Sequence, residues 1–391
     1  MRLKVVLLLF ILVIASVYLA LFQIISFGKP QIRSIICSQP FLLDYENLPG
    51  SLNFSAQFIN ITANPHVEVN DFIVKLGEYN LTAKSVAYNE STQLYDITVN
   101  LPVLQKGKYI LELIYGQHES MNFKGVNVYQ HTGNFSFIHW TDLHYDPPKS
   151  GYENQLNATL QLLKNANPEF VLMTGDMASS EANYQRFYAI LKSIDFDIPI
   201  FFSNGNHEKE SIEELNNAVL YMGEKTVHFE NEYPFAFNYG NYHFINLDSG
   251  IFPYSISGNI SDYQLDWLKN DLQSNQGKNF VACCHHPLYF AGRTMFWSNI
   301  SVANNVMRLL SDYGVIATFA GHAHKSDVTK RGETIYYTTV SGHNETNWVG
   351  NEPFPPSGFR TINVIKNKII EAPVTELFSY YTGEFVYSGA K

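Results

Sequence analysis

The chain has 391 residues, of which 46% are hydrophobic and 16% are charged, and its formal net charge is −10. This length allows two domains with a sizeable core, and the charged fraction lies well below the roughly 25% of an average soluble protein. No basic block occurs in the sequence, so no nucleic-acid scaffold is expected as a partner. An acidic surface also does little to attract an anionic substrate, so any such attraction must be local.

Residues 1–28 form the first distinct segment of the chain. Arg2 and Lys4 precede an uncharged run over residues 5–27, and about 20 apolar residues suffice for a helix to cross a bilayer. The basic residues before this run predict a cytoplasmic N-terminus, with the rest of the chain outside. A cleaved signal peptide is the alternative, but its apolar core normally has only about 7–15 residues, and no clear cleavage site ends this run. We therefore favour a single-pass membrane anchor, which gives a cell-surface protein; cleavage would give a secreted one.

Acceptor sites for N-linked glycans agree with an exported chain. Nine Asn-x-Ser/Thr sequences occur, and none lies in the apolar segment: Asn53, Asn60, Asn80, Asn89, Asn134, Asn157, Asn259, Asn299 and Asn344. An Asn-rich chain also collects such sequences by accident, so they indicate a glycoprotein without establishing one. The three cysteines, Cys37, Cys283 and Cys284, form neither a disulfide framework nor a zinc-binding C-x-x-C pair.

Residues 29–131 are expected to form an all-β domain. Short alternating runs lie at residues 52–61, 67–74, 95–101 and 108–115, and turn-rich sequences separate them. Strands of this length and spacing predict a small β-sandwich of the immunoglobulin or fibronectin type. No cluster of chemically active side chains lies here, so we expect a spacer or a docking module.

Residues 132–391 have a different texture, in which strand-like runs alternate with amphipathic ones. The expected strands are 135–140, 170–174, 198–203, 242–247, 280–284 and 315–320, and the expected helices are 154–165, 183–194, 211–222, 261–274 and 301–313. Apolar residues recur at helical spacing only in the second set. This alternation predicts an α/β fold in which helices cover both faces of a sheet.

Acidic residues, an amide and imidazoles follow five of these expected strands. In chain order they are Asp142 and His144, then Asp176, then Asn206 and His207, then His285, and last His322 and His324. Open α/β sheets bind ligands at the carboxyl ends of their strands. Residues two apart on an extended chain point to the same side, so each D-x-H or H-x-H pair can present both side chains together.

This set of side chains predicts a metal centre. Two carboxylates, one amide oxygen and several imidazoles suit a pair of divalent first-row metal ions. Two ions about 3.5–4 Å apart need a ligand that bridges them, which an Asp can supply, and they would activate a hydroxide held between them. The ions would also neutralise charge that develops on the oxygens of a phosphate ester.

Some nearby residues are expected to support the site or to line its cleft. We expect His286 to support its neighbour and Glu208 to orient the turn that precedes it. Asp248 and His343 are weaker candidates for the cleft wall. Tyr145 and Tyr289 could stack on a substrate, but with 25 tyrosines in the chain a role in the core or at the surface is the better interpretation.

The order D-x-H, G-D, G-N-H-E, H-x-P and G-H-x-H resembles the calcineurin-like metallophosphoesterase superfamily, from residue 135 into the 360s. The resemblance implies an α/β sandwich and two divalent ions of Mn, Fe or Zn. It implies that Asp142, His144 and His324 bind the first ion and that Asp176 bridges the two ions. Asn206, His285 and His322 would complete the site of the second ion. It also implies that His207 is no ligand, but faces the phosphate and assists the leaving group.

Two subfamilies come close to the pattern without matching it. Purple acid phosphatases also place a β-sandwich before such a domain, but they have a metal-binding Tyr three residues after the bridging Asp, where this chain has Ser179. They also lack the His of the first motif, present here as His144, so we expect no iron–tyrosinate centre. Residues 141–146 resemble the first motif of the acid sphingomyelinase-like phosphodiesterases, which are usually rich in cysteine, unlike this chain.

The sequence therefore predicts an extracytoplasmic phosphoric ester hydrolase that acts on a phosphomonoester or phosphodiester by attack of a metal-bridging hydroxide. It does not choose between a nucleotide, a cyclic nucleotide, a sugar phosphate and a lipid headgroup. The alternatives are an acid sphingomyelinase-like phosphodiesterase and a non-catalytic glycosylated surface protein on the same fold. Loss of a ligand would mark the second, yet all the expected ligands are present. A metal-dependent hydrolase of another bond, such as an amide, would normally lack the G-N-H element.

Overall fold

The structure, a computed structural model, describes residues 31–36, 41–59, 72–90, 94–115, 118–120, 122–131, 133–146, 152–222, 231–342, 357–366, 368–371, 373–379 and 385–390. The predicted membrane segment over residues 5–27 lies outside these ranges, as do Cys37, Asn60, His343 and Asn344. Within the described ranges, no helix combines the length and the apolar character that a membrane span requires.

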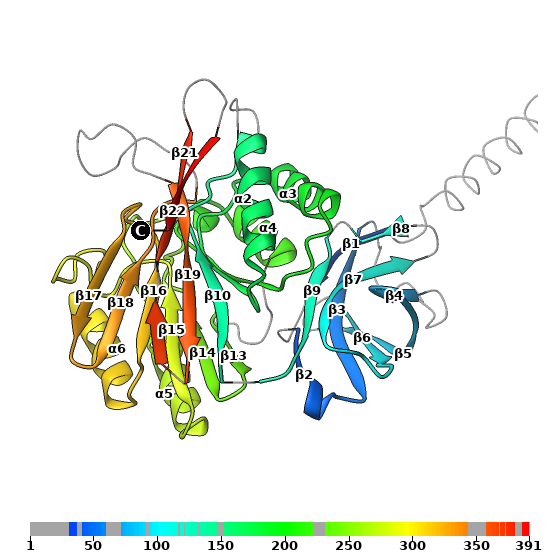
Figure 1. The fold of residues 1–391 in the computed structure, drawn as a ribbon, viewed down its shortest axis with the longest axis horizontal. Helices are drawn as coiled ribbons and strands as arrows, with labels where there is room; N and C mark the ends of the chain where they lie inside the picture. Colours follow the sequence, from blue (N-terminus) through cyan, green and yellow to red (C-terminus); the bar gives the residue numbers. More distant parts are fainter. Residues whose placement is uncertain are drawn as a thin grey trace, which may run out of the picture.

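The part of the chain after residue 131 is built on two β-sheets (Figure 1). The described strands of the first are β10 (Phe135–Trp140), β11 (Val171–Thr174), β12 (Ile200–Ser203), β19 (Ser357–Ile365), β20 (Lys368–Glu371), β21 (Val374–Ser379) and β22 (Phe385–Ala390). Those of the second are β13 (Phe235–Tyr239), β14 (Tyr242–Leu247), β15 (Asn279–Cys284), β16 (Ala317–Ala320), β17 (Asp327–Arg331) and β18 (Thr334–Thr338).

Each sheet has a parallel centre to which antiparallel strands are added. The first runs β12-β11-β10-β19-β21-β22, with β20 paired to β19; β10, β11 and β12 are parallel, and β19 joins β10 in the antiparallel sense. The second runs β13-β14-β15-β16-β18-β17, and β14, β15, β16 and β18 are parallel. The carboxyl ends of β10, β11 and β12 therefore lie at one edge of the first sheet, and those of β14, β15 and β16 at one edge of the second.

Within the described ranges, helices cover one face of each sheet, the outer one. The helices α2 (Tyr152–Ala166), α3 (Glu181–Ser193) and α4 (Ile212–Tyr221) pack on the first sheet, and α5 (Asp262–Ser274) and α6 (Ile300–Asp312) on the second. Four of them begin at a side-chain cap, because Ser180, Ser211, Ser261 and Asn299 each accept a hydrogen bond from a first-turn amide.

The inner faces of the two sheets pack against each other through aromatic rings. Phe137 of β10 and Phe170, the residue before β11, lie 5.3 Å and 5.1 Å, centroid to centroid, from Phe244 of the second sheet. The next residue after Phe137, Ile138, points the other way and joins the core beneath the helices. The expectation of one sheet with helices on both faces is thus wrong: a second sheet takes the place of one helical layer. A strand that is buried on both faces does not reveal in its sequence what covers each face.

The strands before residue 131 lie beside this two-sheet part (Figure 1). They are β1 (Gln31–Ile36), β2 (Leu42–Asp44), β3 (Ser51–Ile59), β4 (Phe72–Leu76), β5 (Tyr79–Asn89), β6 (Leu94–Asn100), β7 (Gly107–Tyr115), β8 (His118–Glu119) and β9 (Lys124–Tyr129). Their hydrogen bonds follow one path, β1-β3-β6-β5-β4-β7-β9-β2, with β8 paired to β7. A separate domain over residues 29–131 stays a prediction.

Buried contacts join these strands to the part of the chain after residue 131. The Nζ of Lys124 donates to the carbonyl of Tyr221, the residue that ends α4, at 3.2 Å. The ring of Tyr129 stacks on Tyr239 of β13 at 4.1 Å between centroids. The two parts of the chain therefore share core contacts at this junction.

Candidate metal centre

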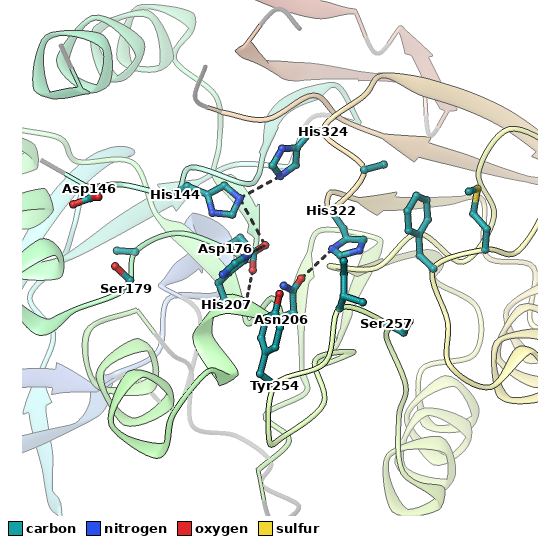
Figure 2. Close-up of a pocket in the computed structure, with 15 residues that line it drawn as sticks. His144, Asp146, Asp176, Ser179, Asn206, His207, Tyr254, Ser257, His322 and His324 are labelled. Atoms are coloured by element: carbon teal, nitrogen blue, oxygen red, sulfur yellow. Dashed lines mark hydrogen bonds and ion pairs between the residues drawn. The ribbon is translucent and has the colours of Figure 1, made fainter. Parts of the chain in front are cut away.

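The loops that follow β10, β11, β12, β15 and β16 bring their polar side chains to one point (Figure 2). Groups of imidazole and carboxylate atoms lie within 4.8 Å of one another there. The residues that the sequence analysis proposed as ligands all lie in this cluster: Asp142, His144, Asp176, Asn206, His285, His322 and His324. We call these residues the donor cluster.

One half of the donor cluster contains Asp142, His144 and His324. The Nε2 of His324 lies 3.2 Å from Oδ1 of Asp142 and 3.2 Å from Nε2 of His144. Two ring nitrogens and a carboxylate oxygen thus face one another. Such a set can hold a divalent first-row cation, since imidazole and carboxylate are both suitable ligands.

The other half contains Asn206, His285 and His322. The Oδ1 of Asn206 lies 3.0 Å from Nε2 of His285 and 2.9 Å from Nδ1 of His322. The Nδ1 of His285 lies 2.7 Å from the carbonyl oxygen of Thr174, to which its N–H donates. This bond directs Nε2 of His285 into the cluster, as in histidines that bind metal.

Asp176 reaches both halves. Its Oδ2 lies 3.1 Å from Nε2 of His285 in one half and 3.8 Å from Nε2 of His144 in the other. Its Oδ1 accepts the backbone N–H of His207 at 2.9 Å, which fixes the carboxylate plane. This position is the one that a ligand shared by two ions requires.

The buried carboxylates make the donor cluster favourable for positive charge. Burial raises the pKa of Asp142, but the imidazoles of His324 and His285 outweigh burial and hold that pKa well below its usual range. Burial lowers the pKa of His285, yet Asp176 and Asp142 raise it to about 10. Two carboxylates with almost no contact with solvent thus attract cationic charge at this point, and the chemistry of the donors fits a pair of divalent ions.

The backbone of the donor cluster is not extended. Asp142, His144, Asp176, His322 and His324 have φ values of 53°, 44°, 54°, 63° and 52°, which lie in the left-handed region that residues other than glycine seldom adopt. The two side chains of each D-x-H or H-x-H pair are therefore not presented from extended chain, and that prediction is wrong. Left-handed turns at both members of each pair aim them inward, and such strain is typical of functional sites.

The carboxylate of Glu208 holds two of the loops together, as expected of a residue that orients the turn. Its oxygens accept the backbone N–H groups of Asp176 at 2.8 Å, Met177 at 2.6 Å and Gly205 at 2.7 Å. At Gly205 the loops approach so closely that a Cβ atom would lie 2.1 Å from Oδ1 of Asp176. The bridging position of Asp176 thus depends on two neighbours of the predicted ligand Asn206.

His207 lies beside the donor cluster and faces a cavity. Its Nε2 is 4.0 Å from Oδ2 of Asp176, and its Nδ1 contacts the carboxylate of Glu210. Burial lowers the pKa of His207, but Asp176 and Glu210 outweigh it and raise the pKa above its ordinary value. The side chain is 35% exposed, so the imidazole is presented to whatever the cavity holds.

The cavity has a volume of about 440 Å³ and opens onto the donor cluster. Its lining contains predicted site residues and several that the sequence analysis did not propose; the latter are Asp146, Ala178, Tyr254, Ile256, Ser257, Met295, Phe296 and Ala323. Tyr254, Ile256, Met295 and Phe296 lie in loops that follow β14 and β15. Their position beyond the carboxyl ends of strands was the signal that could have identified them.

Other weaker expectations have mixed outcomes. Asp248 does not line the cavity; it is buried in an ion pair with Lys209, 2.9 Å from Nζ, and accepts from Asn204 at 3.0 Å. Tyr145 is a core residue. His286 is buried and its Nδ1 lies 3.0 Å from Oγ of Ser249, which fits a supporting role.

Comparison with protein-family models gives one match in this part of the chain. The model described as calcineurin-like phosphoesterase matches residues 135–326. This stretch begins with β10 and ends beyond His324, so it includes every residue of the donor cluster.

A curated relative and solved structures are similar to parts of this chain. A protein of Rhodococcus erythropolis described as a probable cyclic nucleotide phosphodiesterase is 28% identical over 128 residues, 31% of this chain and 40% of its own length. A purple acid phosphatase from yellow lupin (Lupinus luteus) seeds shares the fold over 89% of this chain and 71% of its own, at 12% identity and a TM-score of 0.52. A dimetal phosphatase of Danio rerio is 16% identical, with a TM-score of 0.46, over 59% of this chain and 93% of its own.

Proposed function

Residues 135–326 belong to the calcineurin-like phosphoesterase family, and from this premise we propose that the chain is a phosphoric ester hydrolase. It would hydrolyse a phosphomonoester or a phosphodiester outside the cytoplasm, with two divalent ions of Mn, Fe or Zn. The observation that carries this proposal is the position of Asp176 between two groups of donors at the floor of a cavity.

Each half of the donor cluster would hold one ion. Asp142, His144 and His324 would hold the first, Asn206, His285 and His322 the second, and Asp176 both. Bound divalent ions supply a water of lowered pKa and neutralise phosphate oxygens. The chain itself would position the ester between the donor cluster and His207.

His207 would act as the proton donor for the leaving group. Its imidazole faces the cavity, and the carboxylates of Asp176 and Glu210 favour its protonated form. When the bond between phosphorus and the leaving oxygen breaks, that oxygen gains negative charge, and a proton from Nε2 neutralises it. The Nδ1 contact with Glu210 orients the ring for this transfer.

The location outside the cytoplasm is proposed from the uncharged run at residues 5–27 and from the glycan acceptors. Seven of the nine acceptors lie in described residues, and five of these have exposed side chains: Asn53, Asn80, Asn134, Asn157 and Asn299. Exposed asparagines can carry the bulky glycans that buried ones cannot. We propose a glycoprotein held at the cell surface by its N-terminal segment.

Hydrolysis is favoured over a non-catalytic surface role on the same fold. A protein that only bound partners would gain nothing from two buried carboxylates, which are costly to maintain without a compensating cation. The description of the Rhodococcus relative as a probable cyclic nucleotide phosphodiesterase supports including phosphodiesters among the substrates. Ser179, which lines the cavity where purple acid phosphatases have their Tyr, agrees with a centre of two ions without tyrosinate.

One experiment tests the proposal directly. The chain from residue 28 onward is purified, its metal content is measured, and p-nitrophenyl phosphate and bis(p-nitrophenyl) phosphate are assayed with and without a chelator. We expect two ions per chain and hydrolysis that the chelator abolishes. Asp176→Asn should lose metal and activity together, whereas the exposed α5 variant Asp266→Asn should keep both. The proposal fails if Asp176→Asn retains full metal content and full activity.

A further inference from the structure

One side of the cavity is apolar although it is open to solvent. Tyr254, Ile256 and Met295 line this side and are 40%, 40% and 46% exposed. In the described part of the chain only ten large hydrophobic residues are exposed, and these are three of them. Phe296 lines the same side and is half-buried. We call these four residues the aromatic wall. Exposed apolar side chains that gather in a cavity indicate a binding surface.

The aromatic wall borders the place where the ester would react. The ring of Tyr254 lies 5.6 Å from that of His207, and the ring of Phe296 lies 5.2 Å from that of His322, centroid to centroid. Figure 2 shows Tyr254 beside Asn206 and His207, while Asp146 and Ser179 lie at the opposite rim. A phosphate at the donor cluster would therefore have a polar rim on one side and rings on the other.

The wall is held in place by backbone hydrogen bonds. The N–H of Gly258 donates to the carbonyl of Phe296 at 2.8 Å, and the N–H of Ser298 returns a bond to the carbonyl of Gly258 at 2.9 Å. A Cβ at position 258 would lie 2.7 Å from Cγ of His286, so only glycine allows this segment to pack so closely on that ring. The two loops of the wall thus form one unit.

This unit is hydrogen-bonded to the loop that follows β15 and contains His285. The indole N–H of Trp297 donates to the carbonyl of Pro287 at 3.1 Å, two residues beyond the predicted ligand His285. Since the wall and the donor cluster share this support, the distance between them is set before substrate arrives. A preorganised surface loses less entropy when it binds its ligand.

We propose that the aromatic wall binds a flat aromatic group, an aryl ring or a nucleobase, that the substrate carries on its phosphate. The inference rests on the proposed function, because it places the phosphate at the donor cluster. Two rings and a thioether are suited to a planar π system, since rings stack and sulfur packs favourably on aromatic groups. The cavity volume of about 440 Å³ lies within the roughly 300–1,000 Å³ of sites for small ligands.

Phosphonates test the proposal, because their bond between phosphorus and carbon is not hydrolysed and they report binding alone. Inhibition of p-nitrophenyl phosphate hydrolysis is measured with methylphosphonate, phenylphosphonate and cyclohexylphosphonate. We expect phenylphosphonate to bind at least about tenfold more tightly than methylphosphonate, as stacking on aromatic side chains allows, and more tightly than cyclohexylphosphonate. Equal inhibition by the phenyl and cyclohexyl compounds, or by the phenyl and methyl compounds, overturns the proposal.

Variants assign the preference to the wall. Phe296→Ala should weaken phenylphosphonate by about tenfold and leave methylphosphonate unchanged. Tyr254→Ala should weaken phenylphosphonate by about tenfold relative to Tyr254→Phe. Tyr254→Phe keeps the ring but removes the hydroxyl that contacts Asn206, and it should retain the preference. Tyr263→Ala, at a 71% exposed tyrosine outside this cavity, is the matched control.

The outcome separates the two proposals. If no phosphonate inhibits and no ester is hydrolysed, the proposed function fails, and the aromatic wall with it. If hydrolysis and methylphosphonate inhibition are intact but the alanine variants keep the full preference for phenylphosphonate, only the aromatic wall is contradicted.

Discussion

The proton-donor role of His207 makes a prediction about pH. Asp176 and Glu210 raise its pKa, so the imidazole stays protonated to a higher pH than an ordinary histidine. A proton donor is active below its pKa, and activity falls as pH rises through it. Replacing Glu210 by Gln removes one raising charge, so the alkaline limb of kcat/KM should move to lower pH while the rate below the limb stays close to wild type.

The control and the contrary result for this prediction are specific. The exposed variant Glu213→Gln, on the same segment, should leave the profile unchanged. His207→Ala should lower kcat by about 10²–10⁴-fold, as removal of a general acid does, with the metal content retained. If His207→Ala loses its metal, the residue is a ligand and not a proton donor.

At the scale of residues, the sequence predicted the donor cluster but not the wall. The donors could be predicted because each belongs to a short motif directly after an apolar strand, and such positions meet at one sheet edge. Tyr254 and Phe296 have no such motif around them, and their role depends on a backbone pairing between the loops at Gly258 and Trp297. A contact between loops distant in sequence leaves no periodic pattern that a single sequence displays.

At the scale of elements, the loop after β11 packs closely on the loop after β12. This packing predicts that one methyl group added at Gly205 lowers the affinity for metal. In Gly205→Ala the new Cβ would lie 2.1 Å from Oδ1 and 2.7 Å from the backbone N of Asp176. The loops must separate, which displaces Asp176 while the strands and helices stay formed. We expect metal affinity to fall by about 10–100-fold, as when support of a ligand is lost, with an unchanged circular dichroism spectrum.

A glycine in open space provides the comparison. A Cβ at Gly50 would meet nothing within 4 Å, so Gly50→Ala should bind metal like the wild type. Wild-type metal affinity in Gly205→Ala would show that the loops can move apart without disturbing Asp176. The close packing of the loops would then not determine the position of that carboxylate.

The same scale shows what the sequence predicted of the fold. The strands expected at 135–140 and 242–247 coincide with β10 and β14, and all five expected helices after residue 131 are present within two residues at either end. The second sheet was not expected, nor were β13 and the strands from β17 to β22. Those strands lie in sequence where apolar residues alternate only briefly, and pairing with β10 and β16 decides their structure.

At the scale of the whole molecule, the division at residue 131 that the composition suggests is crossed by buried side chains. Phe123 belongs to the core beneath α3 and α4, and Tyr129 to the core between the two sheets. The amide of Asn127 donates to Glu169 at 2.6 Å. Parts that share a core lose it together, whereas parts joined by a linker unfold separately.

We therefore predict one unfolding transition for the chain from residue 28 onward in differential scanning calorimetry. Lys124→Met tests the junction, because Met keeps the length and apolar stem of the side chain but loses the bond to the carbonyl of Tyr221. Loss of a hydrogen bond from a buried charged group should cost about 1–3 kcal/mol and lower the midpoint of the whole transition. Lys84→Met, at an exposed lysine of β5, should leave the midpoint in place. Two resolved transitions, of which Lys124→Met shifts only one, would mean that the β-strands before residue 131 unfold independently of the metal-binding part.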